Sequence, residues 1–176
     1  MALSLEMRNL INEMADEVIK LYDITIPIND IDDVVNRMNG IVKENPELDT
    51  FSDGRIMKKG TNSFVIEVSP KQSKERRNFT IAHEIGHLFL HMGFMTNDVK
   101  WSNQINVTYY RNGNSESEYQ SNEFAAALLM PKKEYEKIMF ENIEDNMVNI
   151  TKIANYFHVS IDAASNRGRR LGYLRW

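Results

Sequence analysis

His83, Glu84 and His87 form the pattern H-E-x-x-H, whose residue types and spacing suit metal-assisted hydrolysis. Residues four apart on a helix lie one turn above each other on the same face, so both imidazoles can point a nitrogen at one Zn²⁺ ion. Glu84 lies about 100° around the helix, where its carboxylate can take a proton from a water that the metal activates. The pattern therefore predicts a zinc hydrolase, and the alternative is a helix with two incidental histidines.

The residues around the motif predict a helix that is buried on its far side. At about 100° per residue, apolar side chains gather on the face away from the two histidines. These side chains are Ile81, Ile85, Leu88 and Phe89. We therefore expect the histidines to face a cleft, where a metal ion would give a buried histidine pair its partner.

A catalytic zinc site needs a third protein ligand and leaves its fourth position to water. The chain has four histidines and no cysteine. His91 lies about 12 Å along the helix from His83, too far for one tetrahedral ion, so we expect it to support the site from outside or to lie on the helix surface. His158 belongs to a separate helical unit and is expected to be a surface histidine with satisfied hydrogen bonds. A carboxylate therefore remains as the third ligand.

Residues 115–131 predict a helix, because good helix formers follow a Ser/Glu-rich start and end at a proline. Its buried face is defined by Phe124, Ala125, Leu128 and Leu129. Glu118 falls on that face, whereas we expect the opposite, solvated face to carry Glu116, Gln120 and Glu123.

A lone carboxylate that points into a core is costly unless it is paired or binds a metal, so Glu118 is the predicted third ligand. Asn122 lies one turn later on the same face and is expected to hydrogen-bond a ligand histidine or Glu118. The alternative for Glu118 is a partly exposed residue at the helix start, where the helix dipole favours an acid.

Three segments, in this order, resemble the ImmA/IrrE family of metallopeptidase-domain proteins. Residues 77–91 are similar to the family's run R-x-F-T-x-A-H-E-L-G-H-x-x-L-H, and 122–131 to the later part of its run A-N-x-F-A-A-x-L-L-M-P. Residues 153–164 are similar to its segment L-A-x-x-F-x-V-S-x-x-A-A. Many members have glutamate and alanine where this chain has Gln120 and Ser121; because Gln120 is expected on the solvated face, the site should tolerate this departure.

The resemblance implies two histidine ligands and a glutamate ligand four residues before Asn122, which is Glu118. Members of the family relieve repression by acting on helix-turn-helix repressors of phages, mobile elements or stress responses, some of them by cleavage. We therefore expect a zinc-dependent endopeptidase that cleaves a helix-turn-helix transcriptional repressor, with Glu84 as its catalytic residue. The alternative is a zinc-containing regulatory module that binds and sequesters a repressor or another protein without proteolysis.

The expected fold class is α+β. We expect a zincin-like metallopeptidase domain with a small sheet over residues 1–140, and a helix-turn-helix-like C-terminal helical subdomain over residues 141–176 packed on it. A length of 176 residues and 42% hydrophobic residues support one compact core. The charged N-terminus lacks the apolar stretch of a signal peptide, and no run is long enough to span a membrane. With no cysteine, these features favour a cytoplasmic protein.

Periodicity and turn residues predict the remaining elements. The charged residues 71–77 are expected to form a loop that enters the motif helix. Residues 92–114 are long, polar and aromatic, and could cover the cleft. Within them, Tyr109 or Tyr110 is either an oxyanion donor or, more simply, a packing aromatic. Helices are expected at residues 4–21, 30–38, 132–140 and 150–157, and strands at 54–58 and 62–68.

The C-terminal residues resemble a helix-turn-helix, because His158-Val159 makes a short turn and Ser160 can cap a second helix. A basic end follows, formed by Arg167, Arg169, Arg170 and Arg175. These arginines either contact DNA phosphates or an acidic partner, or belong to a helical pair packed on the catalytic body with the arginines merely solvated. The formal net charge of −4 opposes direct DNA binding, so the packed pair is preferred.

Overall fold

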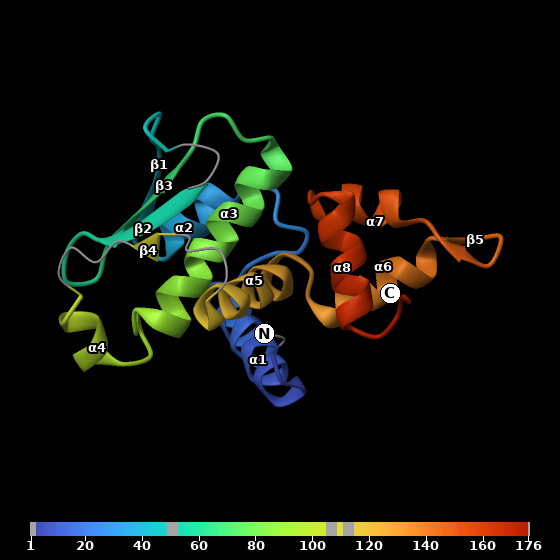
Figure 1. Cartoon of the computed structure of the whole chain (residues 1–176), viewed down its shortest axis with the longest axis horizontal. Coiled ribbons are helices and arrows are strands. Elements are labelled where there is room, and N and C mark those ends of the chain that lie inside the picture. Colours follow the sequence, from blue (N-terminus) through green and yellow to red (C-terminus); the bar gives the residue numbers. More distant parts are fainter. Residues whose placement is uncertain (1–2, 49–52, 105–108, 111–114, 176) are drawn as a thin grey trace.

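The computed structural model describes residues 3–48, 53–104, 109–110 and 115–175, which form a mixed α+β fold. Figure 1 shows the sheet at one end of the molecule, helix α3 across its middle and helices α6–α8 at the other end. The helices are α1 (Leu5–Leu21), α2 (Ile31–Arg37), α3 (Lys74–Gly86), the π-helix η1 (His87–His91), α4 (Asp98–Ser102), α5 (Glu116–Leu129), α6 (Lys132–Glu141), α7 (Ile150–Phe157) and α8 (Ile161–Arg170).

Among the described residues, four strands form one sheet in the order β1-β3-β2-β4. Strand β1 runs parallel to β3, and β2 runs antiparallel to both β3 and β4. The strands are β1 (Gly40–Glu44), β2 (Gly54–Lys58), β3 (Phe64–Val68) and β4 (Tyr109–Tyr110). The two predicted strands are present as β2 and β3. Strand β1 was not predicted, because it is an edge strand with largely exposed side chains and therefore carries little apolar pattern.

Side-chain caps explain where several helices begin. Serine oxygens accept the first free N–H groups of α1, α3, α5 and α8, and Asp30 does so for α2. The expected loop at residues 71–77 is wrong in its second half. Helix α3 begins at Lys74, because Ser73 Oγ accepts a hydrogen bond from the backbone N–H of Arg76 at 3.2 Å. The charged residues of this segment are thus the solvated first turn of the motif helix.

Helix α5 lies between α3 and α1 and contacts both extensively. A Cβ atom added to Gly86 of α3 would lie 3.0 Å from the Cα atom of Ser121 on α5. Any larger residue would push the two backbones apart by a few tenths of an ångström, so glycine favours this close approach. The crossing sets α5 directly over the motif helix.

Glu123 corrects the expected solvated face of α5, because it is only 2% exposed. Its carboxylate accepts hydrogen bonds from Arg167 Nη1 at 3.2 Å, Arg170 Nη1 at 3.0 Å and Asn12 Nδ2 at 3.1 Å. Helices α1 and α8 cover this side of α5, so an acid there is paired with cations instead of water. The single apolar stripe in the sequence does not reveal that α5 is packed on several sides.

Arg167 likewise corrects the expectation of solvated arginines, because it is 1% exposed. Its Nε atom donates to the backbone oxygen of Met130 at 3.0 Å, and its Nη2 atom donates to Asn12 Oδ1 at 2.7 Å. Burial lowers the pKa of Arg167 to about 10, so the guanidinium is still charged at neutral pH. The residue joins α8 to α1 and α5. Arg175 is exposed, as expected.

The predicted C-terminal helix pair is present as α7 and α8, joined through His158 in the left-handed conformation. Helix α6 packs with this pair: the Tyr135 ring stacks on Phe157, and its hydroxyl donates to the Ala164 oxygen at 2.8 Å. Between α6 and α7 the chain forms a small hairpin of β5 (Ile143–Glu144) and β6 (Met147–Val148). The division of the chain after residue 140 stays a prediction.

No helix in the described part of the chain has the length and apolar character needed to cross a membrane.

Replacing Arg167 with Ala should lower the free energy of unfolding by about 3 kcal/mol, because Glu123 would keep its buried charge with one cation fewer. The control is Arg175→Ala, which removes an exposed charge and should change stability by less than about 0.5 kcal/mol. Urea unfolding followed by circular dichroism measures both. Equal stability of the two variants would contradict the structural role of the buried arginine.

Candidate metal centre

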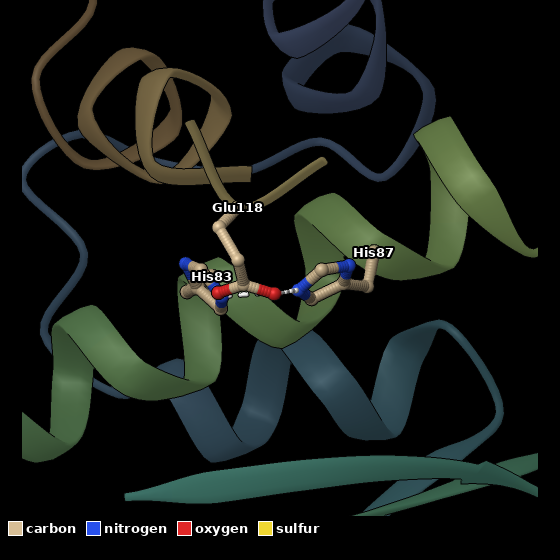
Figure 2. Close-up of side chains that lie close together, drawn as sticks. All are labelled: His83, His87 and Glu118. Carbon is tan, nitrogen blue, oxygen red and sulfur yellow. Dashed lines mark hydrogen bonds and ion pairs between the residues drawn. The ribbon is translucent and has the colours of Figure 1, made fainter. Parts of the chain in front are cut away.

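His83, His87 and Glu118 come together in the fold as three buried side chains whose ligand atoms all lie within 4.8 Å of one another. His83 comes from the last turn of α3, His87 is the first residue of η1, and Glu118 comes from the first turn of α5. Figure 2 shows the Glu118 carboxylate lying between the two imidazole rings. The structure therefore unites the three residues that the sequence analysis selected as metal ligands.

The distances within this group suit one small divalent ion. The Nε2 atoms of His83 and His87 lie 3.0 Å apart, and the two carboxylate oxygens lie 3.2 Å from His83 Nε2 and 3.1 Å from His87 Nε2. A tetrahedral ion with bonds of about 2 Å needs ligand atoms about 3.3 Å apart. Two imidazole nitrogens and one carboxylate also form a donor set that zinc accepts readily. The three side chains therefore fit a zinc ion.

The carboxylate of Glu118 stays ionised in this setting. Burial by itself raises the pKa of this carboxyl group, but hydrogen bonds and charge interactions with His83 and His87 outweigh it and hold the pKa below its ordinary value. The ionised carboxylate is the form of Glu118 that can bind a divalent metal ion.

Asn122 makes the supporting contact that the helical-face argument predicts. Its Oδ1 atom lies 2.9 Å from Nδ1 of His83. An amide oxygen only accepts, so this contact places the ring proton on Nδ1 and leaves the Nε2 lone pair for the metal position. Asn122 lies one turn after Glu118 on α5, so the same helix supplies a carboxylate and orients one histidine.

His91 lies outside the three-residue group, as the sequence analysis expects. Helix η1 makes a wider π turn here, with the Met92 N–H bonded to the His87 oxygen at 2.9 Å. Nε2 of His91 contacts the backbone oxygen of Ser117 at 3.2 Å, next to Glu118. Burial is the main cause that lowers the pKa of His91 to about 4, so the ring is neutral at neutral pH. His91 therefore ties the end of the motif helix to the start of α5.

His158 is not part of this group, and its Nε2 atom contacts Asn29 Oδ1 at 3.1 Å. Its hydrogen bond agrees with the expectation of a satisfied histidine outside the site.

Glu84 is buried beside the start of strand β2. A Cβ atom added to Gly54 would lie 3.3 Å from Glu84 Oε1 and 2.5 Å from Thr80 Cγ2, so glycine at this position leaves room for the carboxylate. Gly54 was not predicted to be part of the site. The sequence shows only a glycine at the first residue of a predicted strand, and a glycine there can also mark a bulge or a bend.

The expected cleft cover falls partly outside the described residues. Within residues 92–114, α4 and β4 are described, and Trp101 is buried against Phe94. Strand β4 pairs with β2 next to the motif helix, but residues 105–108 and 111–114 and the side chains of Tyr109 and Tyr110 lie outside the description. The cover and an oxyanion role for either tyrosine stay predictions.

Comparison with known proteins decides the family. A peptidase family model described as the IrrE N-terminal-like domain matches residues 43–168. The chain belongs to this family. The match covers most of the chain, including the motif helix, α5 and the C-terminal helix pair, so it confirms the resemblance noted in the sequence. The IrrE N-terminal-like domain here carries a buried His-His-Glu group that can bind a metal ion.

A solved structure of a Mycobacterium tuberculosis transcriptional regulator has a similar fold. The TM-score is 0.59 at 16% sequence identity, over 90% of this chain and 46% of that chain. The chain thus spans less than half the length of that regulator, and the likeness concerns the fold alone. None of the curated proteins matches the sequence.

We expect the purified domain to bind one zinc ion. His87→Ala and Glu118→Ala should each lose it, because two ligands hold zinc too weakly. Glu84→Gln should retain it, since this residue is not one of the predicted ligands. Metal analysis after dialysis, together with circular dichroism to confirm folding, measures the stoichiometry. Unchanged zinc content in Glu118→Ala would remove this residue from the ligand set.

Asn122→Ala should weaken zinc binding by about 10- to 100-fold, because His83 would lose the partner that orients its ring. Gln120→Ala is the matched control on the same helix, since Gln120 Nε2 donates to Glu116 Oε1 at 3.1 Å, away from the histidines. Competition with a zinc chelator gives both affinities. Equal affinities in the two variants would show that Asn122 does not support the site.

Proposed function

We propose that the chain is a zinc-dependent endopeptidase that relieves repression by site-specific cleavage of a helix-turn-helix transcriptional repressor. The observation that carries the proposal is the buried convergence of His83, His87 and Glu118 at 3.0–3.2 Å. Such a group in a peptidase family, with a carboxylate one residue along the helix, supports hydrolysis of a peptide bond.

His83, His87 and Glu118 would hold the metal. Zinc bound there would acidify a water molecule and polarise a peptide carbonyl. Glu84 accepts the proton of the attacking water and then delivers it to the nitrogen of the leaving amine. This role explains why the chain keeps a carboxylate inside the motif, because a purely structural metal site needs no general base.

The peptide substrate has a place to align in this proposal. The described strands leave β4 at the edge of the sheet, paired through β2 to the region beside Glu84. An extended peptide can add to such an edge by backbone hydrogen bonds while its carbonyl meets the metal. The repressor as substrate rests on the family resemblance, and a cytoplasmic location follows from that partner.

The decisive test mixes the zinc-loaded protein with a helix-turn-helix repressor encoded in the same genome and detects products by intact mass. We expect one pair of fragments with the wild type and none with Glu84→Gln, which should keep its zinc. Removing one general base typically slows such a reaction by about 10²- to 10⁴-fold.

Two other outcomes have clear meanings. Equal cleavage by Glu84→Gln would overturn the assigned proton transfer. Intact repressor in both samples, held in a stable complex, would favour sequestration by a zinc-containing module over proteolysis.

A further inference from the structure

A cavity of about 340 Å³ lies between helices α3, α5 and α8. Helix α3 lines it with Phe79, α5 with Tyr119 and Asn122, and α8 with Ala163 and Asn166. Its volume is within the range of pockets that bind small molecules or side chains.

The cavity adjoins the metal centre. Asn122 lines it and also contacts His83 at 2.9 Å. Tyr119, another lining residue, directly follows Glu118. Phe79 lies one helical turn before His83, about 6 Å along α3. An extended peptide advances about 3.3 Å per residue, so two or three residues reach from the metal position into the cavity.

The lining favours an apolar occupant over an anionic one. Phe79, Ala126 and Ala163 are apolar and pack against the core. The charged residues on the lining are of mixed sign, namely Glu75, Arg76, Asp162, Arg167 and Arg170. The three arginines already pair with acids, Arg76 with Asp53 and the other two with Glu123. An anionic side chain would therefore meet arginines that are already paired, together with the acids Glu75 and Asp162, whereas an apolar side chain would gain from burial.

We propose that this cavity is a specificity subsite that takes a large apolar side chain of a polypeptide substrate, two or three residues from the scissile bond. Helix α8 forms its outer wall. The helix of the C-terminal pair that would read DNA in a helix-turn-helix thus faces this cavity, with Arg167 and Arg170 bound to Glu123 of α5. The inference rests on the proposed peptidase function, and it assigns to α8 a part in substrate choice.

Tripeptide hydroxamates test the subsite, because the hydroxamate anchors each compound on zinc without any cleavage. There are three series of compounds, one for each position of the tripeptide. Within a series, that position carries Gly, Leu, Trp or Glu, and the other two positions carry Gly. Binding to the zinc-loaded full chain is measured by calorimetry. In one series, Leu or Trp should bind at least about tenfold tighter than Gly, which is the gain expected for burying one large apolar side chain. Glu should give no such gain.

Variants of two α8 residues test whether this helix causes the apolar preference. Ala163→Trp fills the cavity and should abolish the preference while the all-glycine compound binds as in the wild type. Ala163→Ser is the matched control and should keep the preference. Asn166→Trp blocks the same wall from an exposed position, so it serves if Ala163→Trp does not fold.

The outcomes separate this inference from the proposed function. No apolar preference in any series, a preference for Glu, or a preference that survives both tryptophan variants would overturn the subsite. An apolar preference that the tryptophan variants remove supports it, even if the wild type cleaves no repressor and the peptidase proposal fails. Repressor cleavage by a protein without the preference would leave the peptidase standing and remove the subsite.

Discussion

The close contact of α3 with α5 is the constraint on which the metal centre depends. Gly86 allows the backbone of α3 to approach Ser121, and this distance brings the first turn of α5 over the two histidines. Glu118 then lies between imidazole rings that belong to another helix. Three buried polar side chains in such a small volume are costly to assemble without a cation, because each has lost its water. A zinc ion would offset that cost, and its affinity would depend on how firmly the two helices are held.

Several neighbours keep this geometry in place. Asn122 orients His83, and His91 joins the π turn of η1 to the residue before Glu118. Gly54 leaves space for the carboxylate of Glu84 at the start of β2. These contacts come from the sheet, the motif helix and α5, so the site is built where all three meet. Their rigidity matters because a metal site tolerates only small errors in ligand position.

The C-terminal helices belong to the same packed structure through a buried charge cluster. Arg167 of α8 reaches Glu123 of α5 and Asn12 of α1, and the removal of one partner would leave a charge poorly compensated in the interior. This cluster also determines what α8 presents to its surroundings. Two of its arginines are engaged with Glu123, and the same face lines the cavity beside the metal centre. The helix pair that resembles a helix-turn-helix in sequence thus packs on the rest of the chain and, in our proposal, takes part in substrate choice.

The sequence by itself determined the features that depend on local spacing. The H-E-x-x-H pattern and helical periodicity were sufficient to select His83, His87, Glu118 and Asn122, because residues three or four apart on a helix share a face whatever surrounds it. Ser115 and Ser160 marked the starts of α5 and α8 for the same reason, whereas the cap of α3 at Ser73 was missed. Only the tertiary structure decided the burial of Glu123 and Arg167, the pairing of β1, the role of Gly54 and the cavity under α8. Each of these features depends on which distant element packs against the residue. The apolar stripe of a helix predicts one buried face, but it does not predict that a second element covers the polar face.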